Sequence, residues 1–264
     1  MKKLALIVGI NYPDTEFNLR GCINDAEGML SKLLEFGFTT TDIQILIDKV
    51  ATKKNILDGV DRLTQNLEKG DIGVFYYAGH GTQTADLPPI DEPDMLDEAL
   101  VPYDAIKAVK DGEDEIEPAN LLRDDEINER ISLLNQDVHF VVIFDSCHSY
   151  TATHEISTKV RSIPLPEFAK KIKSMISEIP KSDRGLHPTV KMNHYLLAGC
   201  KSEQSSFDDG EHGYFTAELL KEMKPGRTYK ELHDIIVPRI IERSNSSQEP
   251  QFEGPILDKK IFEG

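Results

Sequence analysis

Apolar residues of this chain gather in short runs that are separated by polar and turn-forming residues. The runs are rich in Val, Ile, Tyr and Phe, a composition and length that are typical of buried strands. They lie at residues 4–10, 43–47, 72–78, 138–144 and 195–198.

Helical periods alternate with these runs. One apolar face is formed by Met29, Leu30, Leu33 and Leu34, and another by residues between Ile56 and Leu67, with Thr52 as the predicted N-cap of the second helix. Alternating strands and helices predict an α/β domain with a mainly parallel sheet and helices on both faces. The 264 residues fit one such domain.

Two longer segments break this rhythm. Residues 82–123 hold five prolines and predict a long loop with at most short local structure. Residues 150–190 hold four prolines around an amphipathic stretch at 168–179. Loops of this length in a compact domain are usually functional or disordered.

Charge is unevenly distributed along the chain. The net charge of −16 argues against a nucleic-acid partner, because phosphates repel an acidic surface. Residues 86–126 contain 15 Asp and Glu against three basic residues. This segment is either a solvated acidic surface, a calcium site or a region that attracts cationic substrate.

Three scattered cysteines and a lack of long apolar runs suggest a cytoplasmic chain. A monomer is expected. No apolar run approaches the ~20 residues that span a bilayer, so no membrane partner is expected. The N-terminal run lacks a small-x-small cleavage site and reads as a buried strand. Cys22, Cys147 and Cys200 are too few for a disulfide framework and show no zinc spacing.

Reactive side chains follow two of the predicted strands. The run 72–78 leads into a Gly-His-Gly sequence at His80, and 138–144 leads into Asp-Ser-Cys at Cys147. Parallel strands end at one edge of a sheet, so we expect both side chains there, exposed and close together, with a mobile backbone at His80 between its glycines. A histidine base can activate a thiol nucleophile, and the N–H groups of Gly81 and Cys147 can stabilise an oxyanion.

With these motifs the sequence resembles the caspase-like cysteine peptidases of the metacaspase and orthocaspase type. The resemblance implies a caspase fold, an α/β architecture with a mainly parallel central sheet of about six strands, and a Cys147/His80 dyad. It also implies one peptidase domain over 1–264, with a large-subunit-like region at about 1–150, a connecting segment at about 151–190 and a small-subunit-like region at about 191–264. The motifs that carry it are Leu19-Arg20-Gly21-Cys22-Ile23-Asn24-Asp25-Ala26, Tyr76-Tyr77-Ala78-Gly79-His80-Gly81, Asp145-Ser146-Cys147-His148-Ser149 and Leu197-Ala198-Gly199-Cys200.

The resemblance further implies an acidic pocket for the substrate side chain before the cleaved bond. Its lining residues match Cys22, Asp25, Ala78 and Asp145. Paired carboxylates need a cation, so cleavage after Arg or Lys of protein or peptide substrates is predicted. Self-cleavage is predicted after a basic residue of the connecting segment, the candidates being Lys159, Arg161, Lys181 and Arg184.

Calcium is the one cofactor that the resemblance suggests. Asp97, Asp124 and Asp125 match the aspartates with which some metacaspases bind it. His154 stands where a further acidic ligand is expected, and Tyr150 stands where the family usually has glycine.

Other interpretations are open. A catalytically inactive scaffold that binds a partner would share this fold. A nucleotide-binding domain would need a glycine-rich phosphate loop after the first strand, which residues 9–13 do not provide. Cys200 and His148 are expected to be structural, and we assign surface or core positions to His139, His154, His187, His194, His212 and His233.

Overall fold

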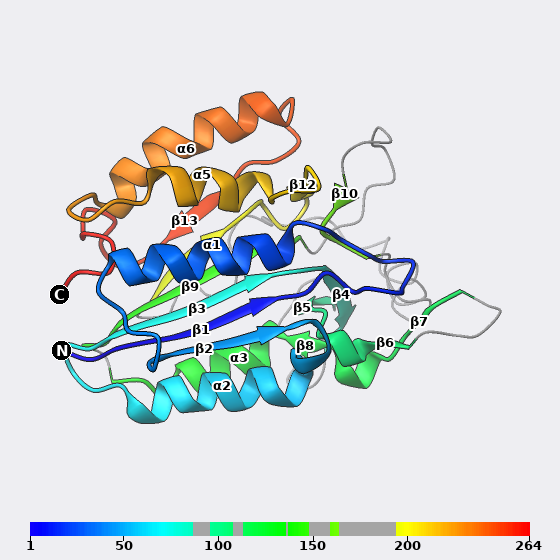
Figure 1. The fold of residues 1–264 in the computed structure, drawn as a ribbon, viewed down its shortest axis with the longest axis horizontal. Helices are drawn as coiled ribbons and strands as arrows, with labels where there is room; N and C mark the ends of the chain where they lie inside the picture. The colour runs from blue at the N-terminus through cyan, green and yellow to red at the C-terminus, as the bar shows by residue number, and fades with distance from the viewer. Residues whose placement is uncertain (87–95, 108–112, 136, 148–158, 164–193) are drawn as a thin grey trace.

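A six-stranded sheet forms the centre of the molecule. The computed structural model describes residues 1–86, 96–107, 113–135, 137–147, 159–163 and 194–264. The strand order is β13-β11-β9-β3-β1-β2, and every neighbouring pair is parallel except β11 and β13 (Figure 1). The predicted mainly parallel sheet is thus confirmed. Its strands are β1 (Lys3–Gly9), β2 (Ile43–Ile47), β3 (Ile72–Ala78), β9 (His139–Asp145), β11 (Tyr195–Ala198) and β13 (Gln251–Glu253).

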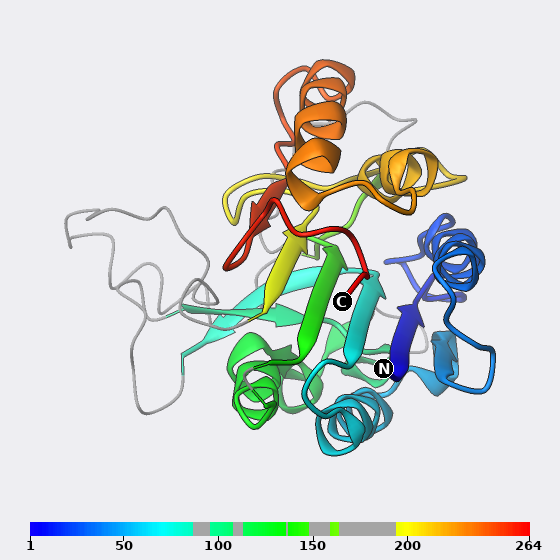
Figure 2. The same ribbon diagram turned by 90° about the vertical axis from the view of Figure 1, so that its left-hand side faces the viewer.

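Helices cover both faces of this sheet, as the alternating pattern predicts. Helices α1 (Cys22–Glu35) and α5 (Tyr214–Glu222) lie on one face, and α6 (Tyr229–Arg243) packs against α5 (Figure 2). Helix α2 (Lys53–Asn66) covers the other face with α3 (Asp124–Ile131) beside it. The predicted cap of α2 is confirmed, because the Thr52 side chain accepts a hydrogen bond from the Asn55 N–H at 3.2 Å.

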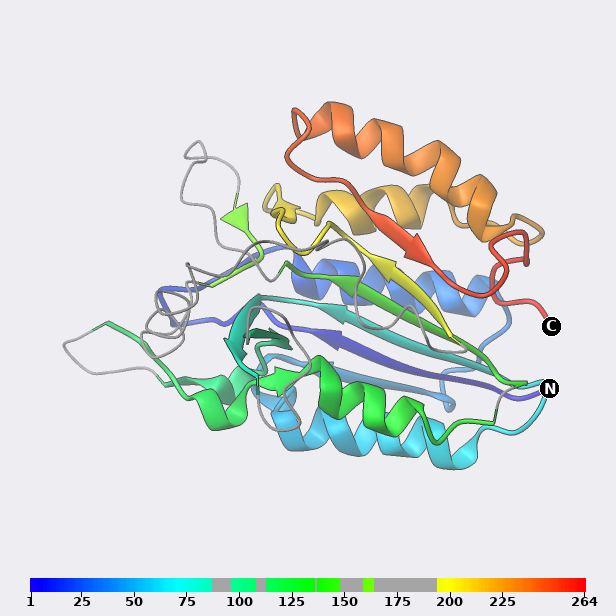
Figure 3. The same ribbon diagram turned by 180° about the vertical axis from the view of Figure 1, so that it is seen from behind.

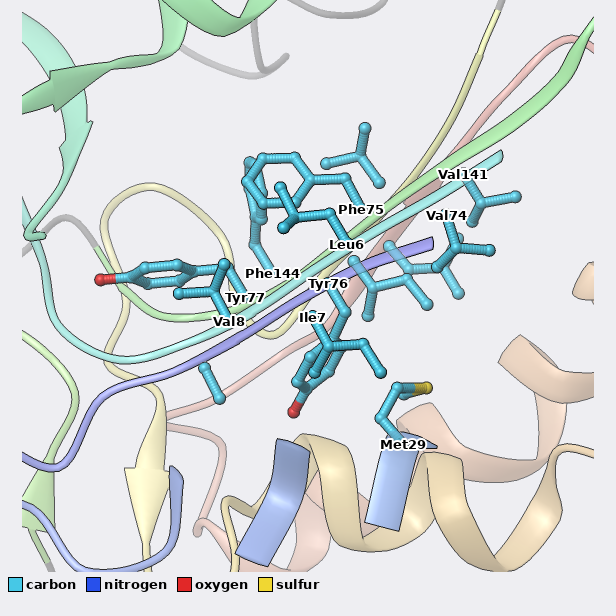
Figure 4. Close-up of a cluster of buried hydrophobic side chains, with 14 of the residues drawn as sticks. Leu6, Ile7, Val8, Met29, Val74, Phe75, Tyr76, Tyr77, Val141 and Phe144 are labelled. Atoms are coloured by element: carbon cyan, nitrogen blue, oxygen red, sulfur yellow. The ribbon is translucent and has the colours of Figure 1, made fainter. Parts of the chain in front are cut away.

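Strand residues alternate between the two faces and build the core. Ile7 and Tyr76 point toward α1, where Met29 lies, whereas Leu6 and Phe75 point to the opposite side (Figure 4). All five side chains are fully buried. Burial of one such side chain contributes about 1.5–3 kcal/mol, and this core keeps the strand ends in fixed register.

The segment 82–123 is expected to be a long loop with at most short local structure, and its described residues agree with this: they form strands of two to five residues, which pair into a small annex beyond the carboxyl end of the sheet (Figure 3). Pro102 and Pro118 lie outside the strands, where a missing N–H interrupts no ladder. One antiparallel sheet of the annex contains β4 (Gly81–Ala85), β5 (Leu96–Leu100) and β8 (Leu122–Arg123). Strand β6 (Ile106–Lys107) pairs with β7 (Glu115–Ile116). Short 3₁₀ helices span Tyr103–Ala105 and Pro118–Asn120 in the annex, and Asp48–Val50 after β2.

A last two-stranded sheet lies at this same end of the molecule. It pairs β10 (Lys159–Val160) with β12 (Phe207–Asp208), and both termini of the chain lie at the opposite end (Figure 1). Among the described helices, none has the length and apolar character needed to cross a bilayer.

Candidate active site

The two residues of the predicted dyad follow neighbouring strands at matching positions. Ala78 of β3 pairs with Asp145 of β9 in the parallel register. His80 and Cys147 each lie two residues beyond this pair. The structure therefore places both at one edge of the sheet, as the motifs predict.

His80 is held by contacts to its backbone and to its ring. The hydroxyl of Tyr12 accepts a hydrogen bond from the His80 N–H at 3.0 Å, and the hydroxyl of Tyr77 donates to its carbonyl at 2.8 Å. The imidazole packs against the Tyr12 ring at 4.9 Å between centroids. The expected mobile backbone is therefore wrong, since Gly79 instead leaves room: a Cβ there would lie 2.7 Å from the Tyr77 hydroxyl.

The ring contact of His80 selects its tautomer. Nε2 lies 2.6 Å from the backbone carbonyl of Phe17, which can only accept, so Nε2 carries the proton. Nδ1 is then the basic nitrogen. The sequence gives no signal for this partner, because the acceptor is a main-chain atom far from the His80 motif.

Cys147 and His80 are both buried, which corrects the expectation of exposed strand ends. The described residues 159–163 run beside both strand ends, where Arg161 and Ile163 form backbone hydrogen bonds with Gly81 and Cys147. Cys200 is also buried, as predicted; its hydrogen bond with Cys147, together with burial, raises the pKa of the Cys200 thiol well above its usual value.

The backbone of Arg161 is bound on both sides. Its carbonyl accepts hydrogen bonds from the N–H groups of Gly81 and Cys147, each at 3.1 Å. These are the two groups that the sequence predicts as oxyanion donors. The Arg161 N–H donates to the carbonyl of Ser206 at 2.9 Å, and the Ile163 N–H donates to that of Gly81 at 3.1 Å.

The guanidinium of Arg161 lies fully buried among three carboxylates. Nη2 is 2.5 Å from Asp25 and 2.9 Å from Asp208, and Nη1 is 3.0 Å from Asp145. Asp25 and Asp145 are the predicted pocket acids, and the structure brings them together. Asp208 was missed, because it lies on a two-residue strand that shows no periodicity.

Asp145 is fully buried. Burial raises its pKa, and the Arg161 guanidinium opposes that shift. Its oxygens accept bonds from the hydroxyl of Thr216 at 2.6 Å, from the Thr216 N–H at 3.1 Å and from the hydroxyl of Ser206 at 2.7 Å. These donors replace the lost water.

Asp25 has a second set of partners on the loop before α5. It accepts bonds from the Gly213 N–H at 3.1 Å and pairs with Nδ1 of His212 at 2.7 Å. This hydrogen bond raises the pKa of His212, a partly exposed residue whose contact with Asp25 the sequence does not reveal. A Cβ at Gly213 would lie 2.2 Å from Asp145 and 2.6 Å from Arg161, so glycine leaves the space that the guanidinium fills.

The other predicted pocket residues lie at the same edge. Cys22 begins α1 and is buried, and burial raises the pKa of its thiol although Arg161 lowers it. Ala78 is buried next to Asp145 in the strand register. Of the other predicted self-cleavage positions, Lys159 pairs with Asp208 in the backbone ladder, whereas Lys181 and Arg184, like His148, Tyr150, His154 and His187, lie outside the described residues.

The acidic segment forms a separate cluster. Carboxylate oxygens of Asp86, Asp97 and Asp125 lie within 4.8 Å of one another. Asp124 adjoins Asp97, and burial with the neighbouring carboxylates raises the pKa of both. Grouped carboxylates of this kind suit a hard cation. Asp86 was missed because it follows β4, a strand that was not predicted.

A mainly parallel sheet with His and Cys after adjacent strands is typical of caspase-like cysteine peptidases. The comparisons agree: a family model described as the caspase domain matches residues 2–262, and the chain belongs to this family. It is 36% identical to Metacaspase-8 of Arabidopsis thaliana over 170 residues, which cover 61% of this chain and 40% of that protein. It is 38% identical to Metacaspase-1 of Botryotinia fuckeliana over 159 residues, covering 57% of this chain and 35% of that protein.

The fold is also similar to a solved structure over its whole length. Protein GSU0716 from Geobacter sulfurreducens is 26% identical, with a TM-score of 0.69, and the match covers 100% of this chain and 99% of that one. The chain therefore spans well under half of the two curated relatives but nearly all of this structural neighbour. The family resemblance that the motifs predict is confirmed.

Proposed function

We propose that the chain is a cysteine endopeptidase that cleaves after Arg or Lys, with Cys147 as nucleophile and His80 as general base. The observation that carries this proposal is the position of Arg161. Its side chain lies among the pocket carboxylates while its carbonyl accepts bonds from the Gly81 and Cys147 amides. A substrate bound in the same way would have its cleaved bond at the nucleophile.

The chemistry follows from these positions. His80 Nδ1 takes the thiol proton, and the Cys147 sulfur attacks the carbonyl carbon. The negative charge that forms on the carbonyl oxygen is stabilised by the N–H groups of Gly81 and Cys147. His80 then protonates the leaving amine, and water hydrolyses the thioester. The Phe17 carbonyl is a positioning group, because it keeps the proton on Nε2 throughout.

Substrates would bind as an added strand. Val160 pairs with Phe207 of β12 in an antiparallel ladder, and the Arg161 N–H continues it to Ser206. Main-chain bonds of this kind bind any extended peptide, so selectivity falls to the side-chain pocket.

The bond between Arg161 and Ser162 is the proposed site of self-cleavage. Arg161 is the one candidate with both its carbonyl and its side chain in place among the described residues. While this bond is intact, Arg161 fills the pocket and excludes other substrates. Its cleavage would separate residues 1–161 from 162–264 within the predicted connecting segment.

Calcium is proposed to bind at the acidic cluster. Asp97, Asp124 and Asp125 would be ligands, and Asp86 is added to the predicted set because its carboxylate adjoins two of them. A divalent ion would neutralise the mutual repulsion of these acids. Cytoplasmic location, a monomeric state and the lack of nucleic-acid partners stay predictions.

Matched fluorogenic peptides that differ only in Arg, Lys or Asp before the cleaved bond test the function. Wild type is expected to cleave the Arg and Lys peptides and to leave the Asp peptide almost intact, because the three pocket carboxylates repel a fourth negative charge. Cys147→Ala removes activity, and Cys200→Ala, which changes the neighbouring thiol, keeps most of it. Cleavage of no peptide would favour the inactive scaffold, and efficient cleavage after Asp would contradict the pocket assignment.

A further inference from the structure

Asp208 reaches the pocket from a different part of the chain than the two motif acids. It is fully buried, and its Oδ2 lies 2.9 Å from Nη2 of Arg161. The N–H of Gly210 donates to its Oδ1 at 2.7 Å, and that of Gly21 donates to its Oδ2 at 3.1 Å. A carboxylate fixed by two backbone amides cannot move toward a shorter side chain.

The three carboxylates contact different ends of the guanidinium. Asp145 binds Nη1, whereas Asp25 and Asp208 share Nη2. A planar fork with several donors matches such a set, and a compact ammonium does not. Along an extended side chain the Nζ of lysine takes the place of the arginine Cζ, one C–N bond of about 1.3 Å short of the guanidinium nitrogens.

The backbone at the inner wall of the pocket packs closely against the carboxylates and the guanidinium. A Cβ at Gly21 would come within 2.8 Å of Asp208, and one at Gly213 would come within 2.7 Å of the Arg161 Cζ. The backbone therefore packs directly behind the carboxylates and around the guanidinium. Closing the gap to a shorter cation would require this backbone to move.

We propose that Asp208 is a specificity-determining residue that makes the pocket prefer Arg to Lys before the cleaved bond. This inference rests on the proposed peptidase function and refines its substrate class. Asp208 supplies the second bond to Nη2, which a lysine ammonium held at the Cζ position cannot reach without water or backbone movement.

The wild-type chain gives the first test. Two peptides identical except for Arg or Lys before the cleaved bond are compared by kcat/KM, and the Arg peptide is expected to be preferred by about tenfold or more, the cost of one lost charged hydrogen bond. Equal values would overturn the role of Asp208 while leaving the proposed function intact. Because Arg161 fills the pocket until the chain cuts itself, the peptides are added after intact-mass spectrometry shows cleavage at Arg161. Cleavage of neither peptide by that sample would instead overturn the proposed function itself.

Asp208→Asn gives the second test, with Asp209→Asn as the matched control. Asp209→Asn removes the same charge one residue away. The Asp209 carboxylate pairs with Arg243, outside the pocket. In Asp208→Asn the Arg/Lys ratio is expected to fall by about tenfold, mainly through loss on the Arg peptide, and in Asp209→Asn it stays unchanged. The ratio cancels any difference in the amount of active enzyme.

A purely structural Asp208 would behave differently. Both peptides would then lose activity by the same factor and the ratio would not change, which overturns the inference. Thermal unfolding reports whether Asp208→Asn folds. If Asp208→Asn does not fold, the ratio of the wild-type kcat/KM values for the Arg and Lys peptides alone decides whether the pocket prefers Arg.

Discussion

Asp25 both binds the Arg161 guanidinium and holds the loop before α5, which encloses that guanidinium. Its carboxylate lies 2.5 Å from Arg161 and accepts bonds from His212 and Gly213. A buried cation that loses one such partner is left underpaired. The same loss relieves repulsion among three carboxylates that face one guanidinium.

Asp25→Asn should therefore damage catalysis far more than folding. We expect kcat/KM on Arg peptides to fall by about 30-fold or more, since truncating one partner of a buried charged pair costs about 2–5 kcal/mol. The melting temperature should shift by only a few degrees. Peptide kinetics and thermal unfolding measure both, with Glu27→Gln on the exposed side of α1 as the control. Unchanged kinetics would exclude Asp25 from the pocket.

At this scale the sequence identifies the residues that lie in motifs and misses those that packing brings in. His80 and Cys147 follow strands, so position and chemistry together predict them, whereas Asp25 and Asp145 are predicted by the motifs that resemble the caspase-like peptidases. Asp208 comes from a two-residue strand whose role depends on its pairing with β10. No local pattern carries that information.

The elements around the acidic cluster join the annex to the main domain. Asp97 lies on β5 and Asp124 begins α3, so an ion bound there would connect two elements that also pack against each other. Burial and neighbouring acids raise the pKa of both carboxyls. Without an ion, folding favours their protonated forms, so their contribution to stability falls as the pH rises above ~4, the ordinary range of an aspartate.

Calcium should therefore stabilise the chain more strongly at pH 8 than at pH 6, because the ion competes with fewer protons at the higher pH. At about 100 times its dissociation constant it contributes about 2.7 kcal/mol. Thermal unfolding in calcium and in EGTA measures this. Asp97→Asn should remove the response, and Glu129→Gln, on the exposed side of α3, should keep it. An unchanged melting temperature across the titration would reduce the cluster to a charged surface.

Element types are predictable where one pattern dominates. The buried runs became strands of the central sheet almost residue by residue, because apolar composition and length decide a parallel strand. The pairing of the annex strands was not predicted, since these strands are short and the prolines of the segment suggest a loop. Pairing with neighbours, which a single segment does not reveal, makes these residues strands.

The whole molecule is built so that cleavage after Arg161 would leave the sheet intact. Strand β11 follows the cleavage point and pairs in parallel with β9, which precedes it, from Tyr195 with Val141 to Ala198 with Phe144. Strand β13 continues the sheet beyond β11. These buried contacts should hold the two fragments together on a size-exclusion column without denaturant.

Intact-mass spectrometry of wild type beside Cys147→Ala tests the proposed activity and its substrate preference in one measurement. After long incubation the wild type should give two fragments, residues 1–161 and 162–264, while Cys147→Ala keeps the mass of the whole chain. Intact masses for both proteins, or the same cleavage in both, would contradict a Cys147 peptidase that cuts after Arg161.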